Sequence, residues 1–237
     1  MEKAEAFAAW IQDVARRTRL LNPREAVTWN LSKTYLRTLH ANGVPVAPTL
    51  WVEGPEDTRV EAWLRDQKAE RGFIKPVVGC CAWETLRFSC DDDGLTQAHE
   101  HLKRAQAAGG MMIQPYLPRV EVDGEISALF FGGHYSHGVQ KIPVAGDYRV
   151  QDDFGATDRP YHMSAEERAI AEHAVSIAEQ LIGQSLLYAR VDLMWDRQDE
   201  LVLTELELIE PSLFFRHDPS APDRLTKALI RTLRAGR

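Results

Sequence analysis

Residues 188–215 read YARVDLMWDRQDELVLTELELIEPSLFF and combine an apolar, strand-like pattern with charged positions. Side chains two apart in a β-strand lie on the same face of the sheet. Arg190 therefore shares a face with Asp192, and Glu205 shares a face with Glu207. Because a domain rarely buries charge without a partner, we expect a ligand at this face. A divalent metal is the expected partner of the three carboxylates, and a phosphate group is the expected partner of the arginine.

The three carboxylates suit a Mg²⁺ site, since Mg²⁺ prefers oxygen ligands and is commonly held by a few carboxylates together with substrate phosphates. An arginine on the same face as Asp192 would neutralise charge on a transferring phosphoryl group. The alternative is a solvated strand face whose charges form salt bridges, and the spacing alone fits both interpretations equally. The apolar residues around the charges favour the metal site, because unpaired charge in a core is costly.

The composition is that of an ordinary globular protein. The 237 residues are 44% hydrophobic and 27% charged, which allows one large domain or two small ones. The net charge of −7 argues against a broad nucleic-acid-binding surface. We see no apolar run of signal-peptide length at the N-terminus and no stretch of roughly 20 apolar residues that would span a membrane. Three cysteines, two of them adjacent, are not typical of a secreted disulfide framework, so we expect a reduced, cytoplasmic protein without nucleic-acid or membrane partners.

Hydrophobic periodicity and turn residues predict an α+β protein. The main expected elements are a helix over 3–20, a connector over 21–27, a helix from Asn30 or Ser32 to His40, strands over 44–52, 71–76 and 146–156, and a helix over 164–183. The composition changes near Pro115, which predicts a hinge. We therefore expect three parts: residues 1–28 as an N-terminal helix and connector, 29–115 as one subdomain, and 116–237 as a second subdomain with the metal site.

Two further stretches are candidates for binding a nucleotide. Lys75 ends an apolar strand just before a small-residue turn, so its ammonium and the backbone N–H groups of residues 78–82 could hold phosphates. An ordinary surface lysine is the alternative. Residues 114–117, QPYL, end a strand at a proline, and free backbone groups there could bind adenine. A strand end leading into a linker is the alternative for that stretch.

Lys141 and Arg149 are cations near glycine-containing loops, where they could hold a triphosphate tail or a carboxylate substrate. We interpret His134 and His137 as strand and turn residues rather than as metal ligands. The adjacent cysteines at 80 and 81 lack an evident base, which a cysteine nucleophile needs, so a small-residue loop is the better interpretation.

The order of these signals resembles the ATP-grasp superfamily, especially the branch of bacterial glutathione synthetases and RimK-type ligases. The resemblance runs from about Trp29 to Phe215. It follows Lys33, FIKPVVG, QPYL, an acid at Glu125, Arg-x-Asp and Glu-x-Glu, in that order. The pieces WNLSK, VPVAPT and ELELIEPSLFF are similar to RimK-like ligases of small-molecule biosynthesis, among them the ring-closing ligases of cycloserine formation.

The resemblance implies an ATP-grasp fold with two α/β subdomains that sandwich ATP. The resemblance implies that Lys33 and Lys75 contact the phosphates of ATP. It implies that Gln114, Pro115, Tyr116 and Leu117 bind the adenine and that Glu125 binds the ribose. The implied ligands of two Mg²⁺ ions, with Mn²⁺ as a substitute, are Asp192, Glu205 and Glu207. The implied catalytic residues are Arg190, which stabilises the transferring phosphoryl group, and Lys141 and Arg149, which lie near the γ-phosphate and the carboxylate substrate.

The activity implied by the resemblance is an ADP-forming ligase that makes an acyl-phosphate from a small-molecule carboxylate, which an amine or similar nucleophile then attacks. A kinase, a ring-closing synthetase of the cycloserine type and a non-catalytic ATP-binding subunit are the alternatives. The chain departs from the family pattern in three respects. The last metal ligand is Glu207 where asparagine is usual, the usual glycine pair is Gly155–Ala156, and only about 28 residues precede Trp29 where a separate N-terminal domain is usual. We therefore expect that most of this domain is lacking, because the chain is a fragment, a naturally short form or one half of a two-chain enzyme whose partner chain supplies the domain. A homodimer through residues 3–20 is a further expectation.

Overall fold

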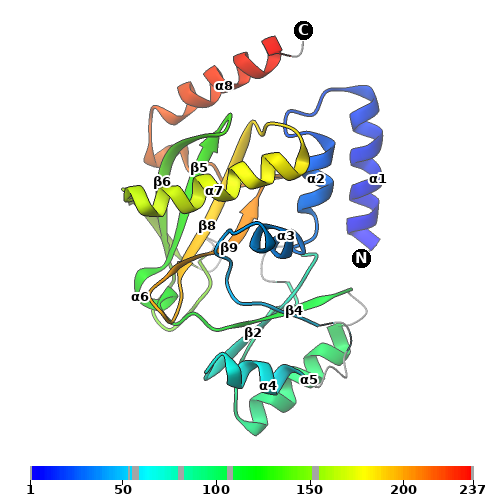
Figure 1. Ribbon diagram of the computed structural model, residues 1–237, viewed down its shortest axis with the longest axis vertical. Coiled ribbons are helices and arrows are strands. Elements are labelled where there is room, and N and C mark those ends of the chain that lie inside the picture. Colours follow the sequence, from blue (N-terminus) through cyan, green and yellow to red (C-terminus); the bar gives the residue numbers. More distant parts are fainter. Residues whose placement is uncertain are drawn as a thin grey trace. The chain divides into compact units, whose positions relative to one another are not determined.

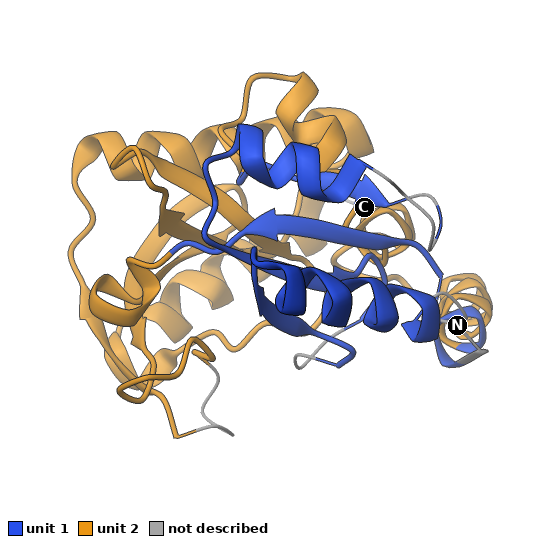
Figure 2. Ribbon diagram, turned by 90° about the horizontal axis from the view of Figure 1, so that it is seen from below, with its two compact units in different colours: residues 1–6, 47–117 blue, residues 7–46, 118–237 orange. Residues whose placement is uncertain are grey.

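The computed structural model describes residues 2–52, 54, 59–79, 83–105, 109–150 and 155–235. The chain forms two compact units, residues 1–6 with 47–117 and residues 7–46 with 118–237 (Figure 2). Each unit contains one antiparallel sheet, as expected of an α+β protein. The three-part division into residues 1–28, 29–115 and 116–237 stays a prediction.

Unit 1 is a four-stranded sheet in the order β1-β4-β2-β3. Its elements are β1 (Leu50–Val52), α4 (Arg59–Asp66), β2 (Arg71–Pro76), β3 (Leu86–Ser89), α5 (Asp92–Ala105) and β4 (Met111–Pro115). Val60 and Leu64 of α4 and Leu102 of α5 pack with Ile74 and Ile113 in one hydrophobic core. Both helices therefore pack against the same face of the sheet (Figure 1).

Unit 2 is built on a five-stranded sheet in the order β7-β6-β5-β8-β9. Its strands are β5 (Glu125–Phe131), β6 (His134–Ile142), β7 (Thr157–Tyr161), β8 (Tyr188–Trp195) and β9 (Leu201–Glu207). Its other elements are α2 (Arg24–Asn30), α3 (Tyr35–Ala41), α6 (Val120–Asp123), α7 (Ala165–Ile182), the short 3-10 turn η3 (Phe215–His217) and α8 (Ala221–Ala235). The first helix, α1 (Glu2–Arg17), is divided: its residues up to Ala6 are assigned to unit 1 and the rest to unit 2.

The long helix α7 lies across the strands of unit 2 (Figure 1). The sequence predicts both of its ends correctly. The Ser164 hydroxyl accepts from the Glu167 N–H at 3.1 Å, the Glu167 carboxylate accepts from the Ser164 N–H at 2.7 Å, and Gly183 closes the helix with a φ of 72°. A buried stripe of small residues, Ala171, Ala174 and Ala178, lets the helix approach the sheet closely.

Four expected elements differ from the structure. The helix expected from Asn30 or Ser32 begins at Tyr35, as α3, and Asn30 instead ends α2. The connector over 21–27 contains most of α2, which packs through the buried Ala26 and Val27. The strand over 44–52 is confined to β1, because Pro45 and Pro48 cannot donate to a strand ladder. Residues 146–150 are not a strand, since the Asp147 side chain accepts from the backbone N–H groups of residues 148 and 149 and forms a turn; residues 151–154 lie outside the described residues.

None of the described helices combines the length and apolar character needed to cross a bilayer. In α1, Trp10 is 57% exposed and its ring lies 5.7 Å from that of Phe7. Self-association through residues 3–20 stays a prediction.

A buried asparagine joins the start of the chain to the sheet of unit 2. The Asn22 amide donates to the carbonyls of Tyr188 and Leu208, both at 2.8 Å, and its oxygen accepts from the Leu187 N–H at 2.8 Å. Asn22 is 5% exposed, so water does not readily replace these bonds. This one side chain links the start of β8 to Leu208, which follows the end of β9.

We expect Asn22→Ala to lower the free energy of unfolding by about 2–4 kcal/mol, because buried backbone groups lose their partners. Asn42→Ala is the matched control: its amide makes one exposed bond, to the Thr38 carbonyl at 2.8 Å. The control should lose less than about 1 kcal/mol. Urea denaturation followed by tryptophan fluorescence measures both, and equal losses would contradict this role for Asn22.

Candidate active site

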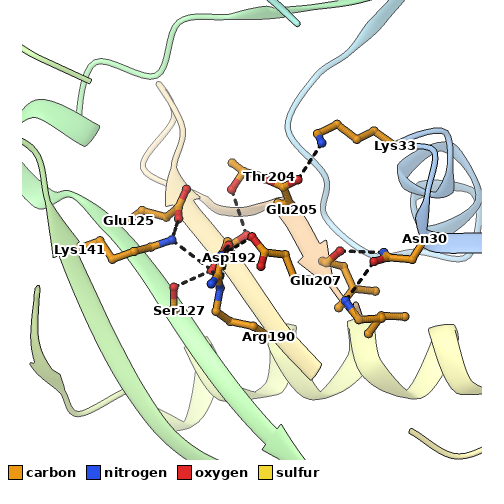
Figure 3. A network of polar contacts seen from close by, with 12 residues as sticks. Asn30, Lys33, Glu125, Ser127, Lys141, Arg190, Asp192, Thr204, Glu205 and Glu207 are labelled. Carbon is orange, nitrogen blue, oxygen red and sulfur yellow. Dashed lines mark hydrogen bonds and ion pairs between the residues drawn. The ribbon is translucent and has the colours of Figure 1, made fainter. Parts of the chain in front are cut away.

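Charged side chains gather on one face of the unit 2 sheet, over β5, β6, β8 and β9 (Figure 3). Directly opposed residues of antiparallel strands share a face. Ser127, Asp192 and Glu205 form one such row across β5, β8 and β9. Arg190 and Glu207 are opposed in the next row. The pairing confirms that Asp192, Glu205 and Glu207 lie on one face.

A β-bulge in β9 brings Glu205 to this face. Leu193 is opposite Leu203, and Asp192 is opposite Glu205, so Thr204 is an extra residue in β9. Leu203 is fully buried on the apolar face, and strict alternation would place Glu205 there as well. The extra residue moves Glu205 to the face of Asp192. The Thr204 hydroxyl donates to the backbone carbonyl of Asp192 at 3.0 Å, which ties the bulge to β8.

Asp192 is the centre of the charged network and is 1% exposed. Arg190 donates to its two oxygens, with Nε–Oδ1 at 3.0 Å and Nη2–Oδ2 at 2.8 Å. The Ser127 hydroxyl donates to Oδ1 at 2.6 Å, and the Lys141 ammonium lies 3.5 Å away. Burial raises the pKa of Asp192, but the charges of Arg190 and Lys141 outweigh burial and lower the pKa to about 2. Asp192 is therefore a carboxylate at neutral pH.

Glu207 occupies a different electrostatic environment. Its carboxylate accepts a hydrogen bond from Arg190, which thus bridges two acids. Burial raises the pKa of Glu207 to about 8, with the charges of Asp192 and Glu205 adding to the effect and Arg190 opposing it. Burial opposes the charge on Arg190, but Asp192 and Glu207 outweigh it and raise the arginine pKa. Burial and the two neighbouring acids therefore outweigh Arg190 and favour the protonated form of Glu207.

Glu125 and Lys141 form a buried ion pair beside Asp192 (Figure 3). They are directly opposed on β5 and β6. Burial raises the pKa of Glu125, although the Lys141 charge opposes this. Burial lowers the pKa of Lys141, but Asp192 and Glu125 outweigh it and raise the pKa. Lys141 is thus a permanent cation that faces two acids.

Lys33 reaches the face from outside the sheet. It lies in the turn between α2 and α3, and its ammonium is 2.9 Å from Oε1 of Glu205. The Glu205 side chain is 34% exposed and that of Glu207 is 27% exposed. Both acids therefore remain accessible to a ligand, unlike Asp192.

The acids fit a hard divalent cation. One oxygen from each of Asp192, Glu205 and Glu207 lies within 4.8 Å of the other two. Carboxylate oxygens are the ligands that Mg²⁺ prefers, and two of these acids remain partly exposed for exchange. Burial and the neighbouring acids raise the pKa of Glu207, so its charged form is disfavoured while no cation is bound. A cation bound here would favour the charged form.

The structure brings together these residues of the sets expected from the sequence: Lys33, Glu125, Lys141, Arg190, Asp192, Glu205 and Glu207. The guanidinium of Arg149 donates to Asp147 at 2.7 Å. The individual roles of all these expected residues stay predictions.

The remaining expected nucleotide-binding residues belong to unit 1. Lys75 and Gln114 alternate with the core residues Ile74 and Ile113, so they lie on the sheet face away from α4 and α5. The Gln114 amide donates to the Thr49 hydroxyl at 2.9 Å. Pro115 ends β4, and the next two residues, Tyr116 and Leu117, are buried. The Tyr116 N–H donates to the Arg71 carbonyl at 2.8 Å. The cysteines at 80 and 81 lie outside the described residues.

Sequence reasoning missed the residues that support the charged ones. Ser127 holds Asp192, Thr204 forms the bulge, and Phe214 places its ring centroid 5.8 Å from the Arg190 guanidinium carbon. Asn30 and Tyr35 bind the backbone of β9. Ser127 has a local signal, since it follows Glu125 by two residues in a strand pattern. The others depend on tertiary contacts that no local pattern indicates.

The chain is similar to ATP-grasp proteins along most of its length. The family model of the prokaryotic glutathione synthetase ATP-grasp domain matches residues 46–214. The cycloserine biosynthesis protein DcsG of Streptomyces lavendulae is 31% identical over 98% of this chain and 80% of the relative. The glutathione synthetase of Ralstonia nicotianae is 27% identical over 87% of this chain, which spans 60% of that enzyme.

Solved structures are also similar to this chain. The crystal structure of D-cycloserine synthetase DcsG matches with a TM-score of 0.87 at 30% identity, covering 98% of this chain and 80% of the other. The D-alanine–D-alanine ligase from Bacillus anthracis matches with a TM-score of 0.65 at 17% identity, covering 90% and 71%. The second likeness concerns the fold alone.

Arg190→Gln should lower the free energy of unfolding by about 3–5 kcal/mol without added metal, because it leaves buried acids uncompensated. Arg119→Gln is the matched control, since Arg119 also pairs with two acids, Asp123 at 2.6 Å and Asp199 at 2.7 Å, but is 35% exposed. The control should lose less than about 1 kcal/mol. Urea denaturation in a chelator measures both, and a loss as small for Arg190→Gln as for the control would show that the buried network is not balanced by this arginine.

Proposed function

Since the chain belongs to the ATP-grasp domain family of prokaryotic glutathione synthetases and is an ADP-forming, ATP-dependent ligase, we propose that it joins a small-molecule carboxylate to an amine or related nucleophile. The observation that carries this proposal is the network around Asp192. A buried arginine and a buried lysine hold one acid in place, while two further acids remain partly exposed beside it. A purely structural face would not retain such a costly arrangement.

Asp192, Glu205 and Glu207 are the proposed ligands of two Mg²⁺ ions. Bound Mg²⁺ would offset the negative charge of the nucleotide phosphates and of the transferring phosphoryl group. Asp192 is ionised and immobile, so it is suited to hold a cation permanently in place. Glu205 and Glu207 complete the set from the edge strand β9, where their side chains are partly exposed. The glutamate at position 207, where related enzymes usually have asparagine, adds a carboxyl group whose charged form a bound cation would favour, and it should strengthen binding of the ions.

Nucleotide contacts are proposed separately for each unit. In unit 2, Lys33 would contact a phosphate and Glu125 the ribose. Lys33 pairs with Glu205, so a phosphate oxygen would replace that carboxylate as its partner. In unit 1, Lys75 would contact a phosphate, and residues 114–117 would bind adenine through their backbone and apolar side chains.

The proposed reaction has two steps. In the first, a carboxylate oxygen of the substrate attacks the γ-phosphorus, the bond to the β-phosphate oxygen breaks, and ADP leaves. In the second, the nucleophile attacks the carbonyl carbon of the acyl-phosphate, inorganic phosphate leaves, and the nucleophile loses a proton. Arg190 would stabilise charge on the transferring phosphoryl group, since it remains protonated throughout.

Lys141 and Arg149 have different support for their proposed roles near the γ-phosphate and the carboxylate substrate. Lys141 belongs to the network and holds Asp192 and Glu125, so its charge acts on the site directly. Arg149 has a side chain that is 38% exposed and is paired with Asp147. A substrate carboxylate would compete with Asp147 for this guanidinium.

A ring-closing synthetase of the cycloserine type is the second candidate. The likeness to DcsG, at 31% identity over 98% of this chain, favours it. In that case the nucleophile and the carboxylate belong to the same molecule, and the second step closes a ring. The proposed ATP-binding residues have the same roles in the ligase and in the ring-closing synthetase.

Calorimetric titration with a non-hydrolysable ATP analogue, with and without Mg²⁺, tests the metal site. We expect the analogue to bind only with Mg²⁺. Glu205→Ala should raise its dissociation constant by more than about tenfold, which is the usual effect of changing a residue that only supports a metal ligand. Glu200→Ala is the control, because Glu200 is exposed and directly precedes β9 in the same hairpin. Equal binding with and without Mg²⁺, or equal effects of the two variants, would refute the assignment.

Product analysis tests the reaction. The full chain is incubated with ATP, Mg²⁺, hydroxylamine and a panel of carboxylates, and ADP and hydroxamates are measured. We expect both products with at least one carboxylate, because hydroxylamine traps acyl-phosphates. A phosphorylated hydroxyl without hydroxamate would indicate a kinase. Tight nucleotide binding with no ADP release across the panel would indicate a non-catalytic subunit.

A further inference from the structure

The outer edge of the sheet at β9 is bound by side chains and by one backbone carbonyl. β9 is the last strand in the order β7-β6-β5-β8-β9, so among the described residues the outer side of its backbone pairs only through a single bridge between Val46 and Leu203. Such an edge normally leaves backbone donors and acceptors to water. Here the Leu206 N–H donates to the Tyr35 hydroxyl at 2.9 Å, and the Leu203 N–H donates to the Pro45 carbonyl at 2.8 Å.

Asn30 binds the same edge at two points. Its amide nitrogen donates to the Leu206 carbonyl at 2.8 Å, and its amide oxygen accepts from the Leu208 N–H at 3.0 Å (Figure 3). The side-chain amide thus offers β9 one donor and one acceptor, as the peptide groups of a further strand would. Asn30 is the last residue of α2, and the buried Ala26 and Val27 anchor that helix.

The residue held in this way lies between two proposed metal ligands. Leu206 separates Glu205 from Glu207, and both of its backbone polar groups are bound, one by Tyr35 and one by Asn30. Its side chain is 1% exposed in the core. We propose that Asn30 is a positioning residue for the metal site: it fixes the backbone of β9 so that Glu205 and Glu207 stay beside Asp192. This inference rests on the metal site of the proposed function.

Asn30 and its two hydrogen bonds to β9 form a clamp on this strand. A physical reason for this clamp is the mutual repulsion of Asp192, Glu205 and Glu207. Their ligand oxygens lie within 4.8 Å of one another, and an edge strand that can bend outward would relieve the repulsion. A backbone held at the edge keeps the oxygens together before a cation binds. Preorganisation of this kind raises metal affinity, and outer-sphere residues that provide it commonly contribute tenfold or more.

The test compares two asparagines that bind this sheet. Asn30→Ala and Asn30→Leu remove both bonds to β9, and the leucine retains the side-chain volume. Asn22→Ala is the matched control, because Asn22 also binds the Leu208 carbonyl but leaves the two backbone groups of Leu206 untouched. The probe is Mn²⁺, whose free concentration is measured by electron paramagnetic resonance with the full chain and a saturating non-hydrolysable ATP analogue.

We expect both Asn30 variants to raise the Mn²⁺ dissociation constant by about tenfold or more, and Asn22→Ala to leave it unchanged at a temperature where each variant is folded. Hydrogen exchange without metal gives an independent readout. The Leu208 amide should exchange faster in the Asn30 variants, whereas the Leu187 amide, which donates to Asn22, should exchange faster in the control.

Three results would overturn the inference. The first is unchanged Mn²⁺ affinity in the Asn30 variants while the wild type binds. The second is an equal loss of affinity in Asn22→Ala, which would mean that affinity follows overall stability. The third is unchanged exchange of the Leu208 amide. If the wild-type chain itself binds no Mn²⁺, the metal site of the proposed function is absent, and the role of Asn30 is lost with it.

Discussion

The ion pair between Arg190 and Asp192 is the interaction on which the rest of the charged face depends. Both side chains are buried, and removing two charges from water is costly even when they are paired. The pair remains only because each member has further partners. Arg190 also binds Glu207. Asp192 also accepts a hydrogen bond from the Ser127 hydroxyl and forms an ion pair with Lys141. The acids that ligands can reach are Glu205 and Glu207, whose side chains are partly exposed.

One sheet in unit 2 serves two purposes, because its faces differ. The face towards α7 carries apolar residues such as Val191 and Leu193, and it supplies the core. The opposite face carries the acids and their cations. The two faces alternate along each strand, and the bulge at Thr204 changes the alternation where Glu205 must join Asp192. A rigid core on one face thus supports a fixed arrangement of charge on the other.

Much of the fold and the acid cluster could be predicted from the sequence, since both depend on local patterns. The helix after Ser164 has a capping box, and Arg190-x-Asp192 shows its shared face by spacing alone. The short helix α2 could not be predicted in this way, because packing of Ala26 and Val27 stabilises it rather than its own sequence. The clamp formed by Asn30 depends on contacts 176 and 178 residues away along the chain, which no window of sequence reveals.

The measurement that tests the account most directly is a crystal structure of the full chain with Mn²⁺ and a non-hydrolysable ATP analogue, with anomalous scattering used to locate the metal. We expect anomalous peaks at bonding distance from carboxylate oxygens of Asp192, Glu205 and Glu207, with the phosphates of the nucleotide completing the coordination. Nucleotide bound without an anomalous peak at these three residues, or with the metal held elsewhere, would contradict the claim that this buried charge exists to bind a metal–nucleotide complex.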